Sequence, residues 1–155
     1  RQAVMNILAA HLAQSRWLDL CSGSGAMACE ALLQGADWVQ AVERNPKIAA
    51  AARRNLQGLG DPSKGKWALE VCAERWLQQP CPEPFDLIYA DPPYAAGLYL
   101  PIATLISSGH WLKRDGQLLL ECEQQNKPSP PPGWMQTRER RYGRSLVLQW
   151  RLDAS

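Results

Sequence analysis

The sequence lacks the features that mark several large classes of protein. It contains no run of about 18 consecutive apolar residues, so no transmembrane helix is expected. It shows no signal peptide or transit sequence, although the chain begins at Arg1 without a methionine and we expect a leading segment to be missing. Its net charge of +2 is too small to indicate nucleic-acid binding by itself, so any basic surface must be local.

Cysteine and histidine are too scattered for a disulfide framework or a metal site. The five cysteines are odd in number and include no C-x-x-C pair, which indicates a reducing compartment. His11 and His110 have no metal-ligand spacing with each other or with the cysteines. We therefore predict that no metal is bound, and we interpret both histidines as structural or solvent-facing.

What the sequence does contain is an alternation of apolar strands and helical segments. Its 155 residues, 46% of them hydrophobic and 21% charged, suffice for one domain over 1–155. The alternation predicts an α/β fold: a Rossmann-like, doubly wound sheet of seven mostly parallel strands, with a C-terminal antiparallel hairpin. The expected strands are 17–20, 38–42, 66–72, 85–90, 117–121, 135–141 and 145–151, and the expected helices are 1–13, 26–33, 47–56, 74–79 and 99–106.

Local signals place several of the boundaries. Asn45 followed by Pro46 is typical of a helix start, with asparagine as the cap and proline at the first position. Gly35 is expected to end the helix predicted over 26–33. The segments 58–65 and 127–133 are expected as loops, and 111–116 as a turn into the fifth strand.

The first strand is followed by a glycine-rich turn that indicates a nucleotide-type site. Gly23, Gly25 and Ala28 fit the G-x-G-x-x-G/A spacing between a strand and a helix. Glu43 ends the next strand about 20 residues later, where a carboxylate would accept hydrogen bonds from ribose hydroxyls. Asp19 lines the same turn and would repel the pyrophosphate of a dinucleotide. It suits a cationic ligand instead, and S-adenosylmethionine (SAM) carries an ammonium, a sulfonium and a ribose but no phosphate.

A second motif follows the fourth strand. Asp91, Pro92, Pro93 and Tyr94 stand directly after the apolar run 85–90. Ligands of open α/β sheets bind beyond the carboxyl ends of the strands, so this loop is expected to face the same crevice as the glycine turn. The Asp91 carboxylate and the Pro92 carbonyl can accept two hydrogen bonds from an exocyclic amine, while Tyr94 offers a ring for stacking on a base.

Both motifs have plainer structural interpretations. The first could be a strand-turn-helix whose glycines serve only the turn, and the second a turn with an aspartate cap and a packed tyrosine. Their combination favours methyl transfer to an amine. Such a reaction depends mainly on alignment and needs no strong base, which suits a chain with no well-placed histidine.

The glycine turn with its acid resembles the first motif of class I SAM-dependent methyltransferases. Over nearly the whole chain, the sequence further resembles the bacterial RsmD-type methyltransferases, which act on guanine N2 in 16S ribosomal RNA. The start Arg1-Gln-Ala-Val-Met-Asn-Ile-Leu8 is similar to that family's Arg-Glu-Ala-x-Phe-Asn-Ile-Leu, and Asp19-Leu-Cys-Ser-Gly-Ser-Gly-Ala26 to its Asp-Leu-Phe-Ala-Gly-Ser-Gly-Ala. Four further segments are similar to that family: Glu30-Ala-Leu-Leu-Gln-Gly-Ala36, Val42-Glu43, Leu120-Glu121 and Tyr142-Gly-Arg-Ser145.

The resemblance implies the residues of the site. SAM would be held by Asp19, Ser22, Gly23, Ser24, Gly25, Glu43, Arg44, Cys72, Ala73 and Asp91, and catalysis would use Asp91, Pro92, Pro93 and Tyr94. Cys72 stands where the family usually has aspartate, so the Ala73 backbone N–H is expected to carry more of the adenine contact. The family's basic segment ahead of the first helix is lacking here, and Cys21-Ser22 replaces its Phe-Ala, with packing as the expected effect.

The last hairpin carries the expected RNA contacts. These are Arg138, Arg140, Arg141, Tyr142 and Arg144, because clustered cations bind phosphates and tyrosine stacks on bases. A solvated arginine face on an edge hairpin is the alternative.

The sequence is compatible with three functions. The first is SAM-dependent methylation of guanine N2 in small-subunit ribosomal RNA, with S-adenosylhomocysteine as product and the RNA or an assembling small subunit as partner. The second is methylation of adenine N6 or cytosine N4 in DNA, although the chain leaves no room for a target-recognition domain. The third is a non-catalytic SAM- or RNA-binding module. We expect a monomer without membrane contact in the bacterial cytoplasm, or in an organelle if the missing leader is a transit sequence.

Overall fold

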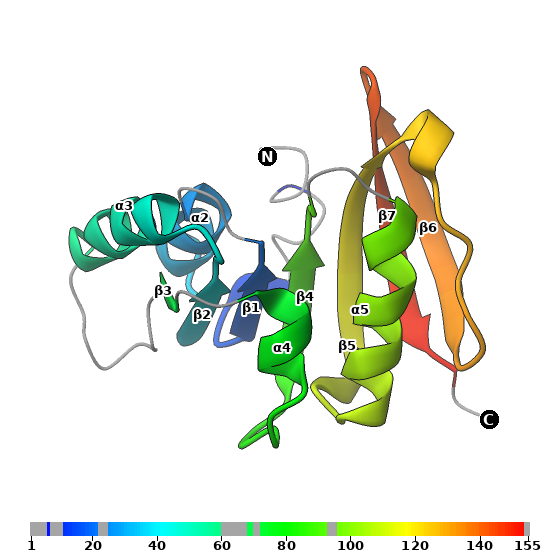
Figure 1. Cartoon of the computed structure of the whole chain (residues 1–155), viewed down its shortest axis with the longest axis horizontal. Helices are drawn as coiled ribbons and strands as arrows, with labels where there is room; N and C mark the ends of the chain where they lie inside the picture. Colours follow the sequence, from blue (N-terminus) through cyan, green and yellow to red (C-terminus); the bar gives the residue numbers. More distant parts are fainter. Residues whose placement is uncertain are drawn as a thin grey trace. The chain divides into compact units, whose positions relative to one another are not determined.

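A computed structural model describes residues 6, 11–21, 25–59, 68–69, 72–92 and 96–153. The chain forms two compact units, Arg1–Ala73 and Glu74–Ser155, which are described separately (Figure 1). Within the described ranges, no helix is long and apolar enough to cross a membrane.

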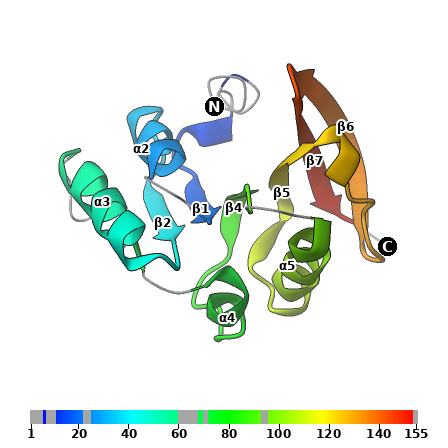
Figure 2. The same ribbon diagram turned by 45° about the horizontal axis from the view of Figure 1, so that its top comes forward.

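The first unit is a parallel sheet whose strands are joined by helices. Strand β1 (Arg16–Leu20) pairs in parallel with β2 (Trp38–Val42), with Arg16 opposite Trp38 and Leu20 opposite Val42. Strand β2 pairs in parallel with β3 (Ala68–Leu69). Helix α2 (Ala26–Leu33) connects β1 to β2, and α3 (Pro46–Gln57) follows β2, as Figure 2 shows.

The helix boundaries of this unit follow from its local sequence. The Asn45 side chain accepts hydrogen bonds from the backbone N–H groups of Lys47 and Ile48 at 3.0 and 3.2 Å, so it caps α3 as predicted. Gly35 has a φ of +105°, a backbone conformation that favours glycine and ends α2. The helix predicted over 26–33 and the strand predicted over 38–42 are confirmed residue for residue.

The second unit is a mixed sheet with the strand order β4-β5-β7-β6. Strands β4 and β5 are parallel, whereas β5–β7 and β6–β7 are antiparallel. This confirms the α/β class with a C-terminal antiparallel hairpin. A single sheet of seven strands stays a prediction, as does one domain over 1–155. The elements are α4 (Ala73–Leu77), β4 (Phe85–Ala90), α5 (Ala96–Ser108), β5 (Leu112–Glu123), a 3₁₀ turn η1 (Gln124–Asn126), β6 (Trp134–Tyr142) and β7 (Ser145–Leu152).

Buried tryptophans connect the helices of the second unit to its sheet. The Trp111 indole packs on Trp76 with ring centroids 4.5 Å apart, and its N–H donates to the Leu77 carbonyl at 2.9 Å. The Trp134 indole N–H donates to the Ala103 carbonyl of α5 at 3.1 Å. Each indole thus buries a large apolar ring while its one donor is satisfied, which is the usual condition for burying tryptophan.

The turn predicted over 111–116 is wrong, because residues 112–116 belong to β5. Phe85 pairs with Leu112, but Leu87 pairs with Gln117, so β5 bulges between these two pairs. Gly116 permits the bulge, since a Cβ there would lie 2.6 Å from Leu112 Cδ1 and 2.9 Å from the Asp86 carbonyl oxygen. The polar residues that suggested a turn form the outside of the bulge, where Lys113 pairs with Asp86 at 3.1 Å.

Other predictions differ at the ends of elements or fall outside the described residues. Helix α5 is longer at both ends than the predicted 99–106. Of the predicted helix 1–13, the structure describes only residues 6 and 11–13, and of the predicted strand 66–72 only 68–69 and 72.

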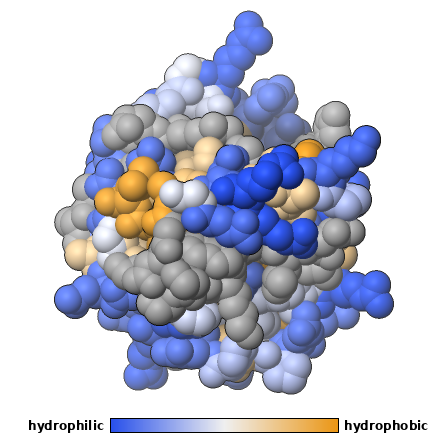
Figure 3. Space-filling view, turned by 90° about the vertical axis from the view of Figure 1, so that its left-hand side faces the viewer, coloured by the Kyte–Doolittle hydropathy of each residue, from blue (hydrophilic) through white to orange (hydrophobic). Residues whose placement is uncertain are grey.

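Figure 3 shows one face of the molecule, where hydrophilic side chains prevail and apolar ones lie in a few groups. This distribution is usual for a surface that faces water. Among the described residues, the exposed large apolar side chains are Leu33, Ile48, Leu59, Leu100, Met135 and Tyr142.

Candidate active site

In the first unit, two acids lie at the carboxyl edge of neighbouring strands. Asp19 is the next-to-last residue of β1, and Glu43 directly follows the last residue of β2. Because Leu20 pairs with Val42, the Cα atoms of the two acids are about 8 Å apart, from the spacing along and between strands. The edge that the sequence predicted for the cofactor therefore holds both predicted acids.

Asp19 is completely buried, with 0% of its surface exposed. Its charge reaches helix α2, since the pKa of the Cys29 thiol is raised first by burial, then by Asp19 and then by Glu30. A carboxylate in such a place is stable as an anion only near compensating charge or hydrogen bonds. A carboxylate at the carboxyl edge of β1 attracts positive charge, so the site fits a cationic group such as the SAM ammonium.

Glu43 is half-buried, and a hydrogen bond orients its carboxylate. The backbone N–H of Asn45 donates to Glu43 Oε2 at 2.9 Å. Asn45 also caps α3, so one residue both starts the helix and holds the acid at the end of β2. This geometry fits a carboxylate that receives ribose hydroxyls. Arg44, the next predicted cofactor residue, is exposed.

The glycine turn is described on both of its sides. Cys21, directly after β1, has a φ of +59°, and Gly25, directly before α2, has a φ of +81°. A Cβ on Gly25 would lie 3.2 Å from Ala52 Cβ of α3, so Gly25 also lets the two helices approach closely. Sequence reasoning missed this partner, although the alanine-rich run 49–52 was a possible signal. The predicted residues Ser22, Gly23 and Ser24 lie outside the described residues.

The predicted adenine contacts lie at the end of the first unit. Cys72 is partly buried, and Ala73 is buried as the first residue of α4. The N–H groups in the first turn of a helix have no intrahelical acceptor. The Ala73 N–H is therefore of the kind that the resemblance requires.

In the second unit, the predicted amine-binding loop begins at the carboxyl end of β4. Asp91 is exposed and Pro92 is buried, while Pro93 and Tyr94 lie outside the described residues. Ala90 pairs with Leu120, so Asp91 stands beside the carboxyl end of β5. That the two edges face one crevice stays a prediction.

Asp91 contributes to the electrostatics of this strand end. Burial first, and then the charges of Glu139, Asp91 and Glu121, raise the pKa of the Cys122 thiol to about 11, while Lys127 lowers it. The thiol of Cys122 is therefore protonated near neutral pH. The Asp91 carboxylate thus adds to a negative field at the end of β5.

The predicted RNA-binding residues all lie on the hairpin of this unit and are all exposed. Arg138, Arg140, Arg141 and Tyr142 belong to β6, and Arg144 lies in the turn to β7. Gly143, with a φ of +62°, makes that turn possible. Figure 1 shows the hairpin tip at the same end of the unit as the end of β4. RNA contact itself stays a prediction.

Parallel strands joined by helices, acids at the carboxyl ends of the strands and a C-terminal antiparallel hairpin fit the fold of the class I SAM-dependent methyltransferases. Solved structures share it. A putative methyltransferase, yhhF, from Escherichia coli has a TM-score of 0.90 and 25% identity, covering 99% of this chain and 86% of that one. The magnesium protoporphyrin IX methyltransferase of Synechocystis, solved with bound SAM, has a TM-score of 0.72 at 16% identity, covers 98% of this chain and 77% of that one, and shows the fold alone.

The chain belongs to the family described as conserved hypothetical protein 95, whose model matches residues 1–151. Its curated relatives include the ribosomal RNA small subunit methyltransferase D of Haemophilus influenzae, 28% identical over 153 residues, covering 98% of this chain and 78% of the relative. The protein of that name from Escherichia coli strain K12 is 27% identical over 155 residues, covering 99% and 77%. The resemblance to RsmD-type methyltransferases is thereby confirmed.

Proposed function

We propose that this protein transfers a methyl group from SAM to the exocyclic N2 amine of a guanine in small-subunit ribosomal RNA. The observation that carries the proposal is Asp91-Pro92 at the carboxyl end of β4, in a chain whose first unit presents Asp19 and Glu43 at the equivalent edge. The names of the family's curated relatives support ribosomal RNA as the substrate.

The first unit supplies the cofactor contacts in this proposal. SAM, when bound, provides an electrophilic methyl group on its sulfonium. The buried Asp19 carboxylate compensates the positive charge of the amino-acid part, and Glu43 accepts hydrogen bonds from the ribose hydroxyls. The Ala73 N–H donates to an adenine ring nitrogen, and Ser22, Gly23 and Ser24 are further predicted cofactor residues.

The second unit supplies the amine contacts. The Asp91 carboxylate and the Pro92 carbonyl accept the two N–H bonds of the amine and point its nitrogen lone pair at the methyl group. Pro92 is buried, which fixes the position of its carbonyl. Tyr94 stacks on the base. Catalysis consists mainly of this alignment, and the proton leaves during or after transfer without a strong base.

The partner in this proposal is ribosomal RNA, free or in an assembling small subunit, and the protein works as a monomer in the bacterial cytoplasm. DNA amines at adenine N6 and cytosine N4 present the same pair of N–H donors, so they are the competing substrates.

The test measures tritium transfer from labelled SAM into small-subunit ribosomal RNA and particles that lack the modification, with duplex DNA in parallel. Asp91→Ala should lower the rate at least about 100-fold, since a misaligned or unheld reacting group loses that much. The matched control is Asp86→Ala, which removes the same side chain near the other end of β4. Asp86 forms a partly exposed ion pair with Lys113, whose loss changes stability little.

Label mapped to guanine N2, lost in Asp91→Ala and kept in Asp86→Ala, is the expected result. Label in duplex DNA alone would show that the substrate is DNA and not ribosomal RNA. SAM binding without any transfer would indicate a binding module.

A further inference from the structure

The two faces of strand β6 differ in what their side chains contact. The strand has a bulge, because Gln136 pairs with Trp150 but Arg138 pairs with Gln149, which leaves Thr137 as an extra residue. Side chains alternate between faces on each side of this bulge. Arg138, Arg140 and Tyr142 therefore share one face, which we call the arginine face. Gln136, Glu139 and Arg141 share the opposite one, which we call the tethered face.

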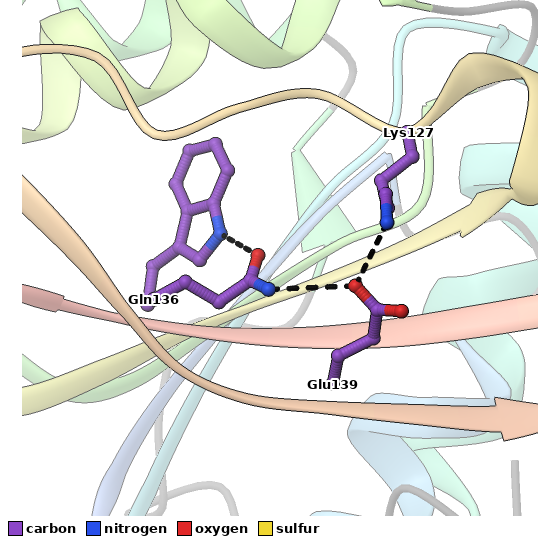
Figure 4. Close-up of polar contacts among 4 residues, drawn as sticks. Lys127, Gln136 and Glu139 are labelled. Carbon is purple, nitrogen blue, oxygen red and sulfur yellow. Dashed lines mark hydrogen bonds and ion pairs between the residues drawn. The ribbon is translucent and has the colours of Figure 1, made fainter.

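Gln136 and Glu139 on the tethered face form contacts within the protein, whereas Arg141 on that face is exposed and forms no polar contact with the described residues. Lys127, after the 3₁₀ turn, pairs with Glu139 at 3.2 Å, and the Gln136 amide donates to the same carboxylate at 3.4 Å, as Figure 4 shows. The Trp150 indole N–H donates to Gln136 Oε1 at 3.0 Å. Trp134 packs near Trp150 on this face and bonds to α5. This face therefore serves to hold the hairpin against the rest of the unit.

The arginine face has no such contacts. Arg138, Arg140 and Tyr142 are all exposed, and their side chains form no hydrogen bond or ion pair with any residue that the structure describes. Alternate residues of a strand are about 6.8 Å apart, so the three side chains form a row about 14 Å long. Two guanidinium groups and a phenol ring in one row suit a polyanion that carries flat rings.

The register connects this row to Asp91. Ala90, Leu120, Leu148 and Glu139 follow one another across the four strands. One step further along, Glu121, Val147 and Arg140 lie side by side, and Asp91 directly follows the last residue of β4. Three strand spacings of about 4.8 Å therefore separate Asp91 from Arg140, about 14 Å in all.

Charge divides this strip in two. Glu121 stands beside Asp91, and both carboxylates repel phosphate at the strand ends, whereas Arg138 and Arg140 attract it. This division of charge suits a nucleic-acid backbone at the hairpin and an uncharged base at Asp91.

We propose that the arginine face binds the RNA phosphates that flank the target guanine, and that Tyr142 stacks on an unpaired base next to it. This inference rests on the proposed function and narrows the RNA contact from the whole hairpin to one face. Arginine binds phosphate through paired N–H donors, and a tyrosine ring stacks on any base. In this arrangement Arg141, on the tethered face, does not touch RNA.

The test compares Arg140→Gln with Arg141→Gln. The two positions are adjacent, carry the same exposed side chain and point to opposite faces. The probe is unmodified small-subunit ribosomal RNA transcribed in vitro, titrated at several salt concentrations. Arg140→Gln should weaken binding about 5- to 10-fold and reduce the slope of log K against log salt by about 1. The RNA affinity of Arg141→Gln should stay within about twofold of that of the parent protein, and the SAM affinity of both variants should be unchanged.

Tyr142 gives a second, independent measurement. Tyr142→Phe keeps the ring and should bind RNA like the parent, whereas Tyr142→Leu should bind at least about fivefold more weakly. Equal effects of the two arginine substitutions, or no effect of either, would overturn the inference. The arginines would then serve only to keep an edge strand from pairing with another chain.

The outcome separates this inference from the proposed function. If guanine is methylated but Arg140→Gln and Arg141→Gln weaken RNA binding equally, only the role of the arginine face is refuted. RNA binding that depends on Arg140, without any methyl transfer to RNA, supports the face and refutes the function.

Discussion

Replacing Gly25 by alanine should destabilise the first unit for two separable reasons. The φ of +81° at Gly25 is unfavourable for a residue with a Cβ, and the added Cβ would lie 3.2 Å from Ala52 Cβ and 3.4 Å from Ala52 Cα. The first effect costs about 1–2 kcal/mol. Crowding against a helix backbone adds about 1–3 kcal/mol, because α2 and α3 must separate to relieve it. We expect a total loss of about 2–5 kcal/mol in the free energy of unfolding.

Gly35→Ala is the matched control in the same unit. Gly35 also has a positive φ, +105°, but of the described residues its Cβ would meet only Ala13, with the Cα at 3.6 Å, an ordinary contact. It should therefore show the backbone effect without crowding. The assay is urea unfolding monitored by tryptophan fluorescence, with the melting temperature as a second measure. Each kcal/mol should shift that temperature by about 2–4 °C in a chain of this size.

A double-mutant cycle identifies the crowding directly. Combining Gly25→Ala with Ala52→Gly should give a favourable coupling of about 1–3 kcal/mol, after allowing for the lower helix propensity of glycine at position 52. A Gly25→Ala variant no less stable than Gly35→Ala, with no coupling to Ala52, would refute the argument that Gly25 serves helix packing.

The remaining predictions concern the cofactor edge and the buried thiol. Glu43→Ala should weaken SAM binding by about 1.5–3 kcal/mol, roughly 10- to 150-fold in Kd by calorimetry, because hydrogen bonds to a charged acceptor are lost. Asp37→Ala, just before the amino end of the same strand, should leave Kd unchanged, and a similar loss in both variants would contradict a site at the carboxyl edge. Asn45→Ala should cost about 1 kcal/mol of stability through the lost helix cap, measured by urea unfolding. Because burial raises the pKa of Cys122 to about 11 from 9.0, the unfolded thiol ionises first, and stability should fall as pH rises from 9 to 11. Cys122→Ala should reduce that fall in unfolding experiments across this range, and an unchanged pH profile would count against the raised pKa.

The sequence alone predicted the elements whose boundaries are local. The strands 38–42 and 85–90 and the helix 26–33 have the predicted bounds, because each is a uniform apolar or helical run closed by glycine, proline or polar residues. Asn45 caps its helix as expected, since capping involves only the next three residues. The carboxyl-edge positions of Asp19, Glu43 and Asp91 followed from strand ends for the same reason.

Tertiary structure decided the features that depend on pairing between distant segments. The bulge near Gly116 exists because β5 must stay paired with β4 while extra residues loop out, and the polar composition there looked like a turn. The bulge at Thr137 shifts the alternation of β6 by one residue, so Arg140 and Arg141 serve different faces, which a cluster of arginines in the sequence cannot reveal. The contact of Gly25 with Ala52 likewise appears only when two helices pack. Local chemistry sets where an element begins and ends, whereas its neighbours set the register and the face that each side chain occupies.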